Sequence, residues 1–298
     1  MSSAGFVMGL SRRGMLGVGA GVAAALAAPG YVSSALAQSQ VAGDRMLQVR
    51  NATVQINYAG VRFLIDPMLA DQGAYPGFPG SAMSHLRNPL VPLPVPASAL
   101  MDVDAVIVTH THLDHWDEAA QRALPKAMPI FAQNETDAET IRGQGFTEVR
   151  VLDASTQFRG VSLARTGGHH GRDEILKAIP MLDPVCGVVL SKPGHKTVYL
   201  AGDTVWNDEV STAITQHRPD IIILNAGYAQ IIDLGPILMG PQEILTVSKA
   251  APQARLIATH MEAVNHCILS RADLKAFAER EGFVSNLDIP GDGEWVTL

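Results

Sequence analysis

The sequence predicts an α/β fold, and three observations support this prediction. Short apolar runs of strand length recur along the chain, each bounded by polar residues or glycine. Segments with the apolar spacing of helices lie between and after these runs. Of the 298 residues, 47% are hydrophobic, which is enough for a large core without disulfides. Such alternation is typical of sheets whose outer faces are covered by helices.

The expected elements follow one another along residues 46–298. A strand pair is expected at 53–57 and 61–65, around the turn at 58–60. Further strands are expected at 105–109, 161–165, 197–201, 221–224 and 256–259, and helices at 117–124, 135–143, 207–217, 241–251 and 271–280. Since no linker, repeat or low-complexity tract interrupts them, residues 38–298 are expected to form a single domain.

Residues 66–100 are a different kind of segment, because seven prolines exclude most regular structure there. A long irregular loop in a compact domain often forms a lid or a wall of a binding cleft. The alternative is a surface excursion that only covers a sheet edge. The sequence leaves both interpretations open.

The N-terminus is interpreted as a targeting segment. Arg12 and Arg13 directly precede an Ala/Gly-rich apolar run, and residues 35–37 form an A-x-A cleavage site. The pattern resembles a bacterial twin-arginine signal, removed after residue 37, and predicts a periplasmic mature protein. An ordinary secretory signal and an uncleaved anchor are the alternatives. The apolar run is too short for a comfortable membrane span, so stable membrane insertion is not expected.

The charge balance argues against nucleic acid as a partner. The net charge is -7, and without Arg12 and Arg13 the chain keeps 20 basic residues against 29 acidic ones. Cys186 and Cys267 are the only cysteines and have no C-x-x-C spacing, so both are expected to be buried free thiols.

A histidine-rich motif follows the expected strand at 105–109. It reads His110-Thr-His112-Leu-Asp114-His115. Three imidazoles and a carboxylate so close together have little reason to cluster unless a cation binds them. Alternate positions such as His110 and His112 can face one cation, while Asp114 and His115 can face a second.

Three more ligand-type residues follow expected strands. His170 comes after the strand at 161–165, Asp203 after 197–201 and His260 after 256–259. Functional groups gather at strand ends in layered α/β folds, so these side chains are expected to converge on the histidine-rich motif.

The ordered motifs resemble those of the metallo-β-lactamase-fold hydrolases. They are Phe63-Leu-Ile-Asp-Pro67, His110-Thr-His-Leu-Asp-His115, Gly168-His-His-Gly171, Gly202-Asp-Thr204 and His260-Met-Glu262. The resemblance spans nearly all of residues 46–298 and is greatest to the branch with ascorbate-6-phosphate lactonase and the phospholipase D that cleaves N-acylphosphatidylethanolamine. It implies an αββα sandwich, two sheets flanked by helices, with metals at one edge.

The resemblance also implies a ligand set for two divalent metal ions. One metal is expected on His110, His112 and His170, the other on Asp114, His115 and His260, with Asp203 bridging them. His115 and Asp203 stand where true β-lactamases commonly have other ligands, which argues against antibiotic hydrolysis. Zinc is the expected metal, while manganese and iron also suit these ligands.

A two-metal hydrolase acting on a small molecule is therefore the predicted function. A hydroxide held between two cations is a strong nucleophile, and a lactone, an ester or a phosphoester is the expected substrate. The lactone is favoured because the chain is acidic. An iron-dependent redox enzyme of the same fold and a non-catalytic metal-binding protein are the alternatives.

Two residues are expected to take part in catalysis, Asp114 and His266. His266 is suited to protonating a leaving group or holding a substrate anion, and a structural, hydrogen-bonded histidine is its alternative. Of the adjacent His169 and His170, the family pattern favours His170 as the metal ligand, so His169 is expected to lie outside the ligand set.

Overall fold

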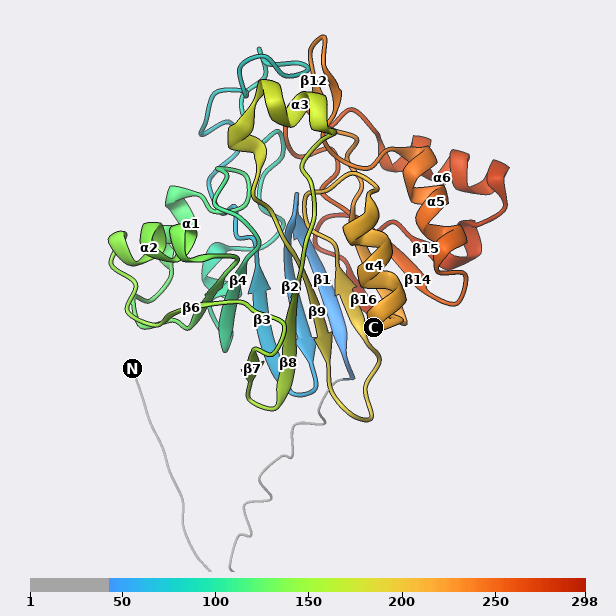
Figure 1. The fold of residues 1–298 in the computed structure, drawn as a ribbon. Helices are drawn as coiled ribbons and strands as arrows, with labels where there is room; N and C mark the ends of the chain where they lie inside the picture. The colour runs from blue at the N-terminus through green and yellow to red at the C-terminus, as the bar shows by residue number, and fades with distance from the viewer. Residues whose placement is uncertain (1–42) are drawn as a thin grey trace, which may run out of the picture. The chain divides into compact units, whose positions relative to one another are not determined.

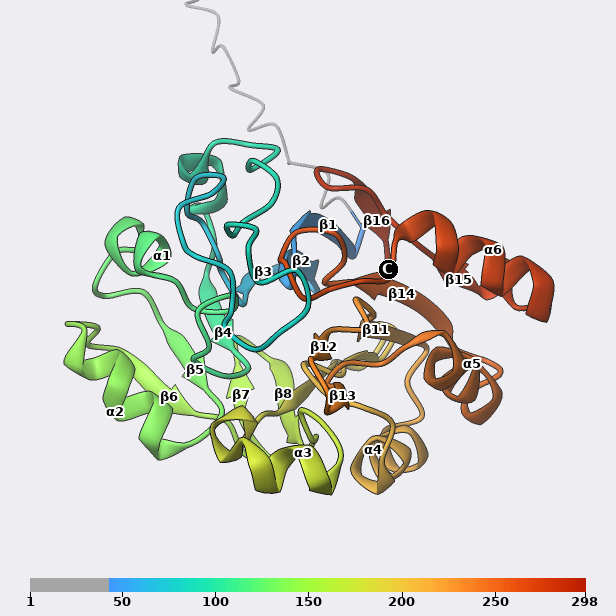
Figure 2. The same ribbon diagram turned by 90° about the horizontal axis from the view of Figure 1, so that it is seen from above.

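Two seven-stranded β-sheets pack face to face in the computed structural model, which describes residues 43–298 (Figure 1). Helices cover the outer face of each sheet, as Figure 2 shows from above. The predicted αββα sandwich is therefore confirmed. The predicted signal segment, residues 1–37, lies outside the described residues.

The first sheet has the strand order β16-β1-β2-β3-β4-β5-β6. Its strands are β1 (Arg45–Arg50), β2 (Thr53–Tyr58), β3 (Val61–Ile65), β4 (Ala105–Val108), β5 (Ile130–Ala132), β6 (Val149–Val151) and β16 (Trp295–Thr297). Helices α1 (Glu118–Ala123) and α2 (Glu135–Gly143) pack on its outer face.

The second sheet has the order β15-β14-β11-β10-β9-β8-β7. Its strands are β7 (Gln157–Phe158), β8 (Val161–Thr166), β9 (Gly187–Ser191), β10 (Val198–Leu200), β11 (Ile221–Asn225), β14 (Arg255–Thr259) and β15 (Leu287–Asp288). Helices α4 (Asp208–His217), α5 (Pro241–Ala250) and α6 (Arg271–Glu281) cover it. Helix α3 (Asp173–Ala178) and the ribbon of β12 (Gln230–Ile231) and β13 (Gly235–Pro236) lie beyond the strand ends (Figure 1).

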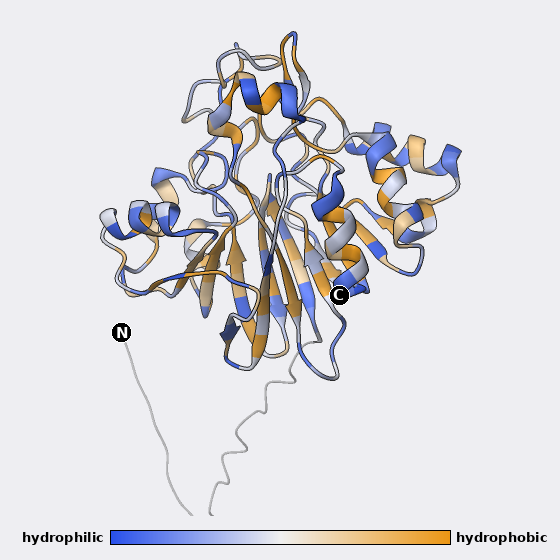
Figure 3. Ribbon diagram, in the orientation of Figure 1, coloured by the Kyte–Doolittle hydropathy of each residue, from blue (hydrophilic) through white to orange (hydrophobic). Residues whose placement is uncertain are grey.

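The inner strands are buried on both faces, which explains their unbroken apolar runs. In β11, Ile221 and Ile223 point into the core between the sheets. Ile222 and Leu224 point the other way and pack under the helices. Figure 3 accordingly shows the strands mainly as hydrophobic, whereas the covering helices carry both hydrophilic and hydrophobic residues.

The strand directions bring several chain segments to one edge of the sandwich. β8 and β10 are both antiparallel to β9 and hence parallel to each other, and β10, β11 and β14 are parallel. In the first sheet β3 and β4 are parallel. The loops that follow these strands therefore emerge together, above the sheets in Figure 1.

The proline-rich segment 66–96 contains no helix or strand and is held in place by buried side chains. Arg50 is fully buried, and its Nη2 donates to the carbonyl oxygens of Met68 and Ala70. Further along, the 3-10 helix η1 (Ala97–Leu100) leads into β4. Within residues 43–298, no helix is long and apolar enough to cross a membrane.

Candidate metal centre

All seven side chains that the sequence predicts as metal ligands meet at this edge. The loop after β4 contributes four of them, and the loops after β8, β10 and β14 contribute one each. They are His110, His112, Asp114, His115, His170, Asp203 and His260, and all except the half-buried His112 are buried.

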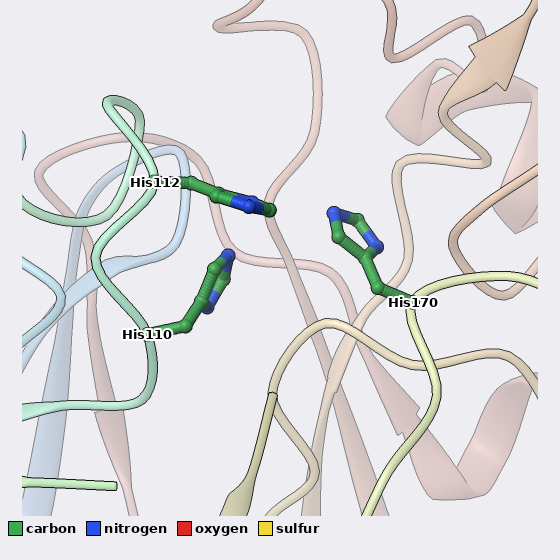
Figure 4. A group of neighbouring side chains, drawn as sticks. All are labelled: His110, His112 and His170. Atoms are coloured by element: carbon green, nitrogen blue, oxygen red, sulfur yellow. The ribbon is translucent and has the colours of Figure 1, made fainter. Parts of the chain in front are cut away.

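Three imidazoles form the first group. Figure 4 shows His110 and His112 from the loop after β4 facing His170 from the loop after β8. One nitrogen of each ring lies within 4.8 Å of the corresponding nitrogen of the others. Three ring nitrogens at that mutual distance can coordinate one cation.

Asp114, His115 and His260 form the second group. The His260 Nε2 atom lies 3.4 Å from Asp114 Oδ2 and 3.2 Å from His115 Nε2. Asp203 lies between the groups, because its Oδ2 is 3.1 Å from His115 Nε2 and 3.3 Å from His170 Nε2. A carboxylate in this position faces both groups at once.

Contacts outside the cluster determine which nitrogen of each ring faces inward. His115 Nδ1 is hydrogen-bonded to Asp66 Oδ2 at 2.9 Å, and His170 Nδ1 donates to the Ile237 carbonyl oxygen at 2.9 Å. Their Nε2 atoms are thus free for a metal. His112 uses the opposite nitrogen. Its Nε2 donates to the Met181 carbonyl oxygen at 2.9 Å, which leaves Nδ1 for coordination.

The backbone is strained where it places these groups. Asp66 and His260 have positive φ angles of 47° and 56°, a region that non-glycine residues seldom adopt. Before Asp203, Gly202 has φ 71°, and a Cβ there would lie 2.3 Å from the Cys186 carbonyl oxygen. Only glycine fits this turn, which sets the direction of the Asp203 side chain.

The electrostatics of the second group favour a cation. Burial lowers the pKa of His115, but the charges of Asp203, Asp66 and Asp114 outweigh this effect and raise that pKa to about 10. Burial raises the pKa of Asp203, yet the nearby imidazoles, His115 foremost, hold it well below its usual range. In the first group, burial and the neighbouring imidazoles lower the pKa of His110. The carboxylates thus stay ionised and His110 stays neutral, as metal ligands must be.

Two atoms of the cluster lack a hydrogen-bond partner among the described residues. They are His110 Nε2 and Asp114 Oδ2, and both are buried. Buried polar atoms are nearly always paired, so unpaired ones at the centre of a cluster of ligand-type groups point to an ion. Imidazoles and carboxylates fit Zn²⁺ and also Mn²⁺ or Fe²⁺.

A cavity of about 300 Å³ opens beside the cluster. It reaches His112, Asp114 and His170, and most of its remaining lining is apolar. The apolar lining residues are Phe78, Pro79, Leu113, Ile179, Met181, Leu182, Ile231 and Ile237. No lysine or arginine is among the described residues that line it.

The proline-rich loop forms one wall of this cavity through Phe78, Pro79 and Ser81. Asn265, fully buried, fastens that wall: its Oδ1 accepts from the Phe78 amide, and its Nδ2 donates to Ser81 Oγ. The sequence left two interpretations of the proline-rich loop open, and the structure fits the one in which the loop forms a wall of a binding cleft.

The two neighbouring histidines occupy different environments. His170 belongs to the cluster, whereas the His169 side chain is 43% exposed and its Nδ1 lies 3.1 Å from Asp183 Oδ2. His266 lies outside the cluster but lines the cavity.

Three residues that orient the cluster were not predicted from the sequence. Asp66 contacts His115, Asn225 Nδ2 donates to Asp203 Oδ1 at 2.6 Å, and Cys267 Sγ lies 3.3 Å from His260 Nδ1. Asp66 directly follows β3 and Asn225 is the last residue of β11, so their positions at strand ends could have indicated a role at this edge. Both cysteines are buried and free, as predicted, but nothing in the sequence indicated the contact of Cys267.

Comparison with known proteins agrees with this geometry. The family model described as a β-lactamase superfamily domain matches residues 61–261. A UPF0173 protein of Bacillus subtilis, YddR, is 49% identical over 84% of this chain and 98% of its own length.

Two crystal structures have nearly the same fold. An isothiocyanate hydrolase from Delia radicum gut bacteria is 47% identical, with a TM-score of 0.83 over 85% of this chain and 99% of that one. A possible metal-dependent hydrolase from Veillonella parvula is 42% identical, with a TM-score of 0.85 over 86% and 100%. The finer resemblance to the lactonase and phospholipase D branch stays a prediction. With its ligand-type cluster at the edge of an αββα sandwich, the chain belongs to the β-lactamase superfamily and is a metal-dependent hydrolase.

Proposed function

We propose that the protein is a dinuclear hydrolase of small uncharged molecules with an electrophilic carbon. One cation would be held by His110, His112 and His170. The other would be held by Asp114, His115 and His260, with Asp203 shared between them. Bound cations would lower the pKa of a water molecule to about 7 and polarise the bond under attack. Zinc is the proposed metal.

The cavity is the observation that supports this class of substrate. Its apolar lining without lysine or arginine suits an uncharged compound with an apolar substituent. It offers no cationic side chain for a phosphate, which disfavours the phosphoesters expected from the sequence. An isothiocyanate, the substrate named for the relative of 47% identity, has the favoured properties, as do lactones and simple esters.

The reaction proposed for the isothiocyanate consumes one water molecule. The water oxygen bonds to the central carbon of R–N=C=S, the carbon–nitrogen bond breaks, and both water hydrogens end on nitrogen. The products are the amine R–NH₂ and carbonyl sulfide. In this reaction Phe78 and Met181 would hold the apolar group in the cavity that Asp114 also lines.

A substrate panel tests the proposal. The zinc-loaded protein is expected to release amine from phenethyl isothiocyanate, to lose activity on chelation and to regain it with added cation. A γ-lactone, an aryl ester and an aryl phosphodiester complete the panel, and His85→Ala, an exposed site on the same loop as Phe78, is the matched control. Turnover of the phosphodiester alone would contradict the substrate class.

Metal analysis of natively produced protein tests the metal count and the main alternative. Two zinc ions per chain would support the proposal. Two iron ions together with oxygen consumption would favour a redox enzyme of the same fold, and metal without any turnover on the panel would favour a binding protein.

We also propose that the protein acts in the periplasm after export by a twin-arginine signal. Replacing Arg12 and Arg13 by lysine is expected to leave the precursor in the cytoplasm. Mature protein that still reaches the periplasm of this variant would argue for an ordinary secretory signal.

A further inference from the structure

The cavity beside the metal centre contains five polar side chains, and four of them are already engaged. His112, Asp114 and His170 belong to the ligand groups. Ser81 Oγ donates to the Phe78 carbonyl oxygen and accepts from Asn265 Nδ2. The fifth, His266, is in no ligand group, and its ring makes no hydrogen bond to any of the described residues.

His266 is an unpaired imidazole in a nearly closed environment. Its exposed fraction is 5%, and its Nδ1 is buried without a partner among the described residues. The ring meets Phe78 edge to face, with a centroid distance of 4.9 Å. An imidazole that is buried and unpaired costs free energy unless a ligand completes its hydrogen bonds.

Contacts of the two neighbouring residues fix the chain on both sides of this ring. On one side, the Asn265 amide donates to Asn88 Oδ1, and the Asn265 side chain is bound to the proline-rich loop. On the other side, Cys267 contacts His260 of the second ligand group. A ring on a backbone fixed at both neighbours, and packed on Phe78, is preorganised for contact with a ligand in the cavity.

We propose that His266 is a catalytic residue that hydrogen-bonds the leaving atom of the substrate. This inference rests on the proposed function and deepens it. The leaving atom is the nitrogen of an isothiocyanate or the ring oxygen of a lactone, and it gains negative charge as its bond to carbon breaks.

A fixed imidazole N–H stabilises that charge without rearrangement. An imidazole carries at least one N–H whether it is neutral or protonated, so His266 has a proton to donate. Because the ring is not a ligand, its loss leaves the ligand groups intact.

His266→Phe tests this role, because phenylalanine keeps the ring shape against Phe78 and removes both nitrogens. The variant is expected to keep two zinc ions and the melting temperature, while kcat falls about 10²–10³-fold. His266→Gln restores a donor and is expected to recover part of kcat. His85→Gln, which removes an exposed imidazole, is the control.

A second measurement does not depend on turnover. In protein labelled with ¹⁵N-histidine, the ring signal of His266 is identified by its absence from His266→Gln. Phenylurea, an uncharged compound that places nitrogen beside a carbonyl carbon, is expected to shift that signal and to bind at least tenfold more weakly to His266→Phe.

Full kcat in His266→Phe, or loss of zinc in proportion to kcat, would overturn the proposal. An unchanged His266 signal at saturating phenylurea would do the same. If the wild type hydrolyses nothing on the panel, the proposed function fails, and the phenylurea shift still decides whether His266 contacts a ligand.

Discussion

Asp66→Asn is expected to weaken metal binding by the second ligand group while the fold is kept. Asp66 Oδ2 is hydrogen-bonded to His115 Nδ1 at 2.9 Å and accepts from Thr109 Oγ1 at 2.7 Å. Its Oδ1 accepts from the Thr109 amide at 2.7 Å. The carboxylate therefore holds a proton on His115 Nδ1, so that Nε2 is the nitrogen that faces Asp203 and can give up its own proton to a metal.

An amide cannot keep all three contacts. If the Asn oxygen stays on the Thr109 amide, its NH₂ group meets His115 Nδ1, and the ring proton must move to Nε2, where it blocks coordination. If the amide turns over, two buried N–H groups face each other, at a cost of about 1–3 kcal/mol. The second arrangement is disfavoured by these facing donors, so the first is expected and the metal affinity of the second group falls.

The expected loss is about 10–100-fold in affinity for one of two cations, or about 1.4–2.8 kcal/mol. Competition with a chromophoric chelator measures it. Thr109→Val, which removes only the hydroxyl contact to Asp66 and keeps the backbone donor, is the matched control and is expected to lose far less. Wild-type affinity for both cations in Asp66→Asn would refute the reasoning.

Three other predictions concern the same centre. Asp203→Asn is expected to lower both metal content and turnover, because the Asp203 carboxylate faces both ligand groups. Elemental analysis measures the metal content, and two metal ions per chain in the variant would contradict a bridging role for Asp203. His170→Ala is expected to deplete one metal and abolish turnover while His169→Ala keeps both metals and measurable activity, and the reverse ranking would contradict the ligand assignment. Zinc binding to chelator-treated protein at pH 7.5 is expected to release protons, since the pKa of His115 is raised from 6.5 to about 10 and a cation displaces that proton. Calorimetry in buffers of different ionisation enthalpy counts the protons, and a release of none would argue against a protonated His115.

The same shift sets a pH dependence of stability for the chelator-treated protein. Because the folded-state pKa of His115 lies above its unfolded value, its stabilisation is complete below about pH 6.5 and is lost as the pH rises toward 10. The zinc-loaded protein does not share this loss, since the imidazole is then neutral and coordinated.

Most of the sheet strands near the centre were predictable because they are buried on both faces. β11 and β14 appear in the sequence as unbroken apolar runs, and each predicted strand and helix is present with small shifts at its ends. β9 was not predicted, and neither were β1, β5, β6, β7, β15 and β16. β9 runs antiparallel between β8 and β10, and a short turn without a helix joins it to β10, so the alternation of strands and helices gives no sign of it.

The ligand cluster was predictable for a related reason. Parallel strands end at one edge, so a histidine or aspartate after each of several strands falls in one place. The cavity was not predictable, because its walls come from segments without periodicity. Phe78 lies in the proline-rich loop and Met181 in the 3-10 helix η2 (Pro180–Leu182), and their positions depend on Asn265 and on Asp183 rather than on local sequence.

The ligand groups and the cavity are one connected structure. His112 donates through Nε2 to the Met181 carbonyl oxygen, and the His170 amide donates to Asp183 Oδ1, so the middle of η2 and the residue after it are held by residues of the first group. A change at His112 therefore displaces a wall of the cavity as well as a ligand. Among the described residues, His110 makes no hydrogen bond to η2, and its ring is hydrogen-bonded to Thr109 in its own loop. Because the two histidines share one group but differ in this contact, loss of His110 leaves the contact to η2 in place, whereas loss of His112 changes the shape of the substrate site as well as coordination.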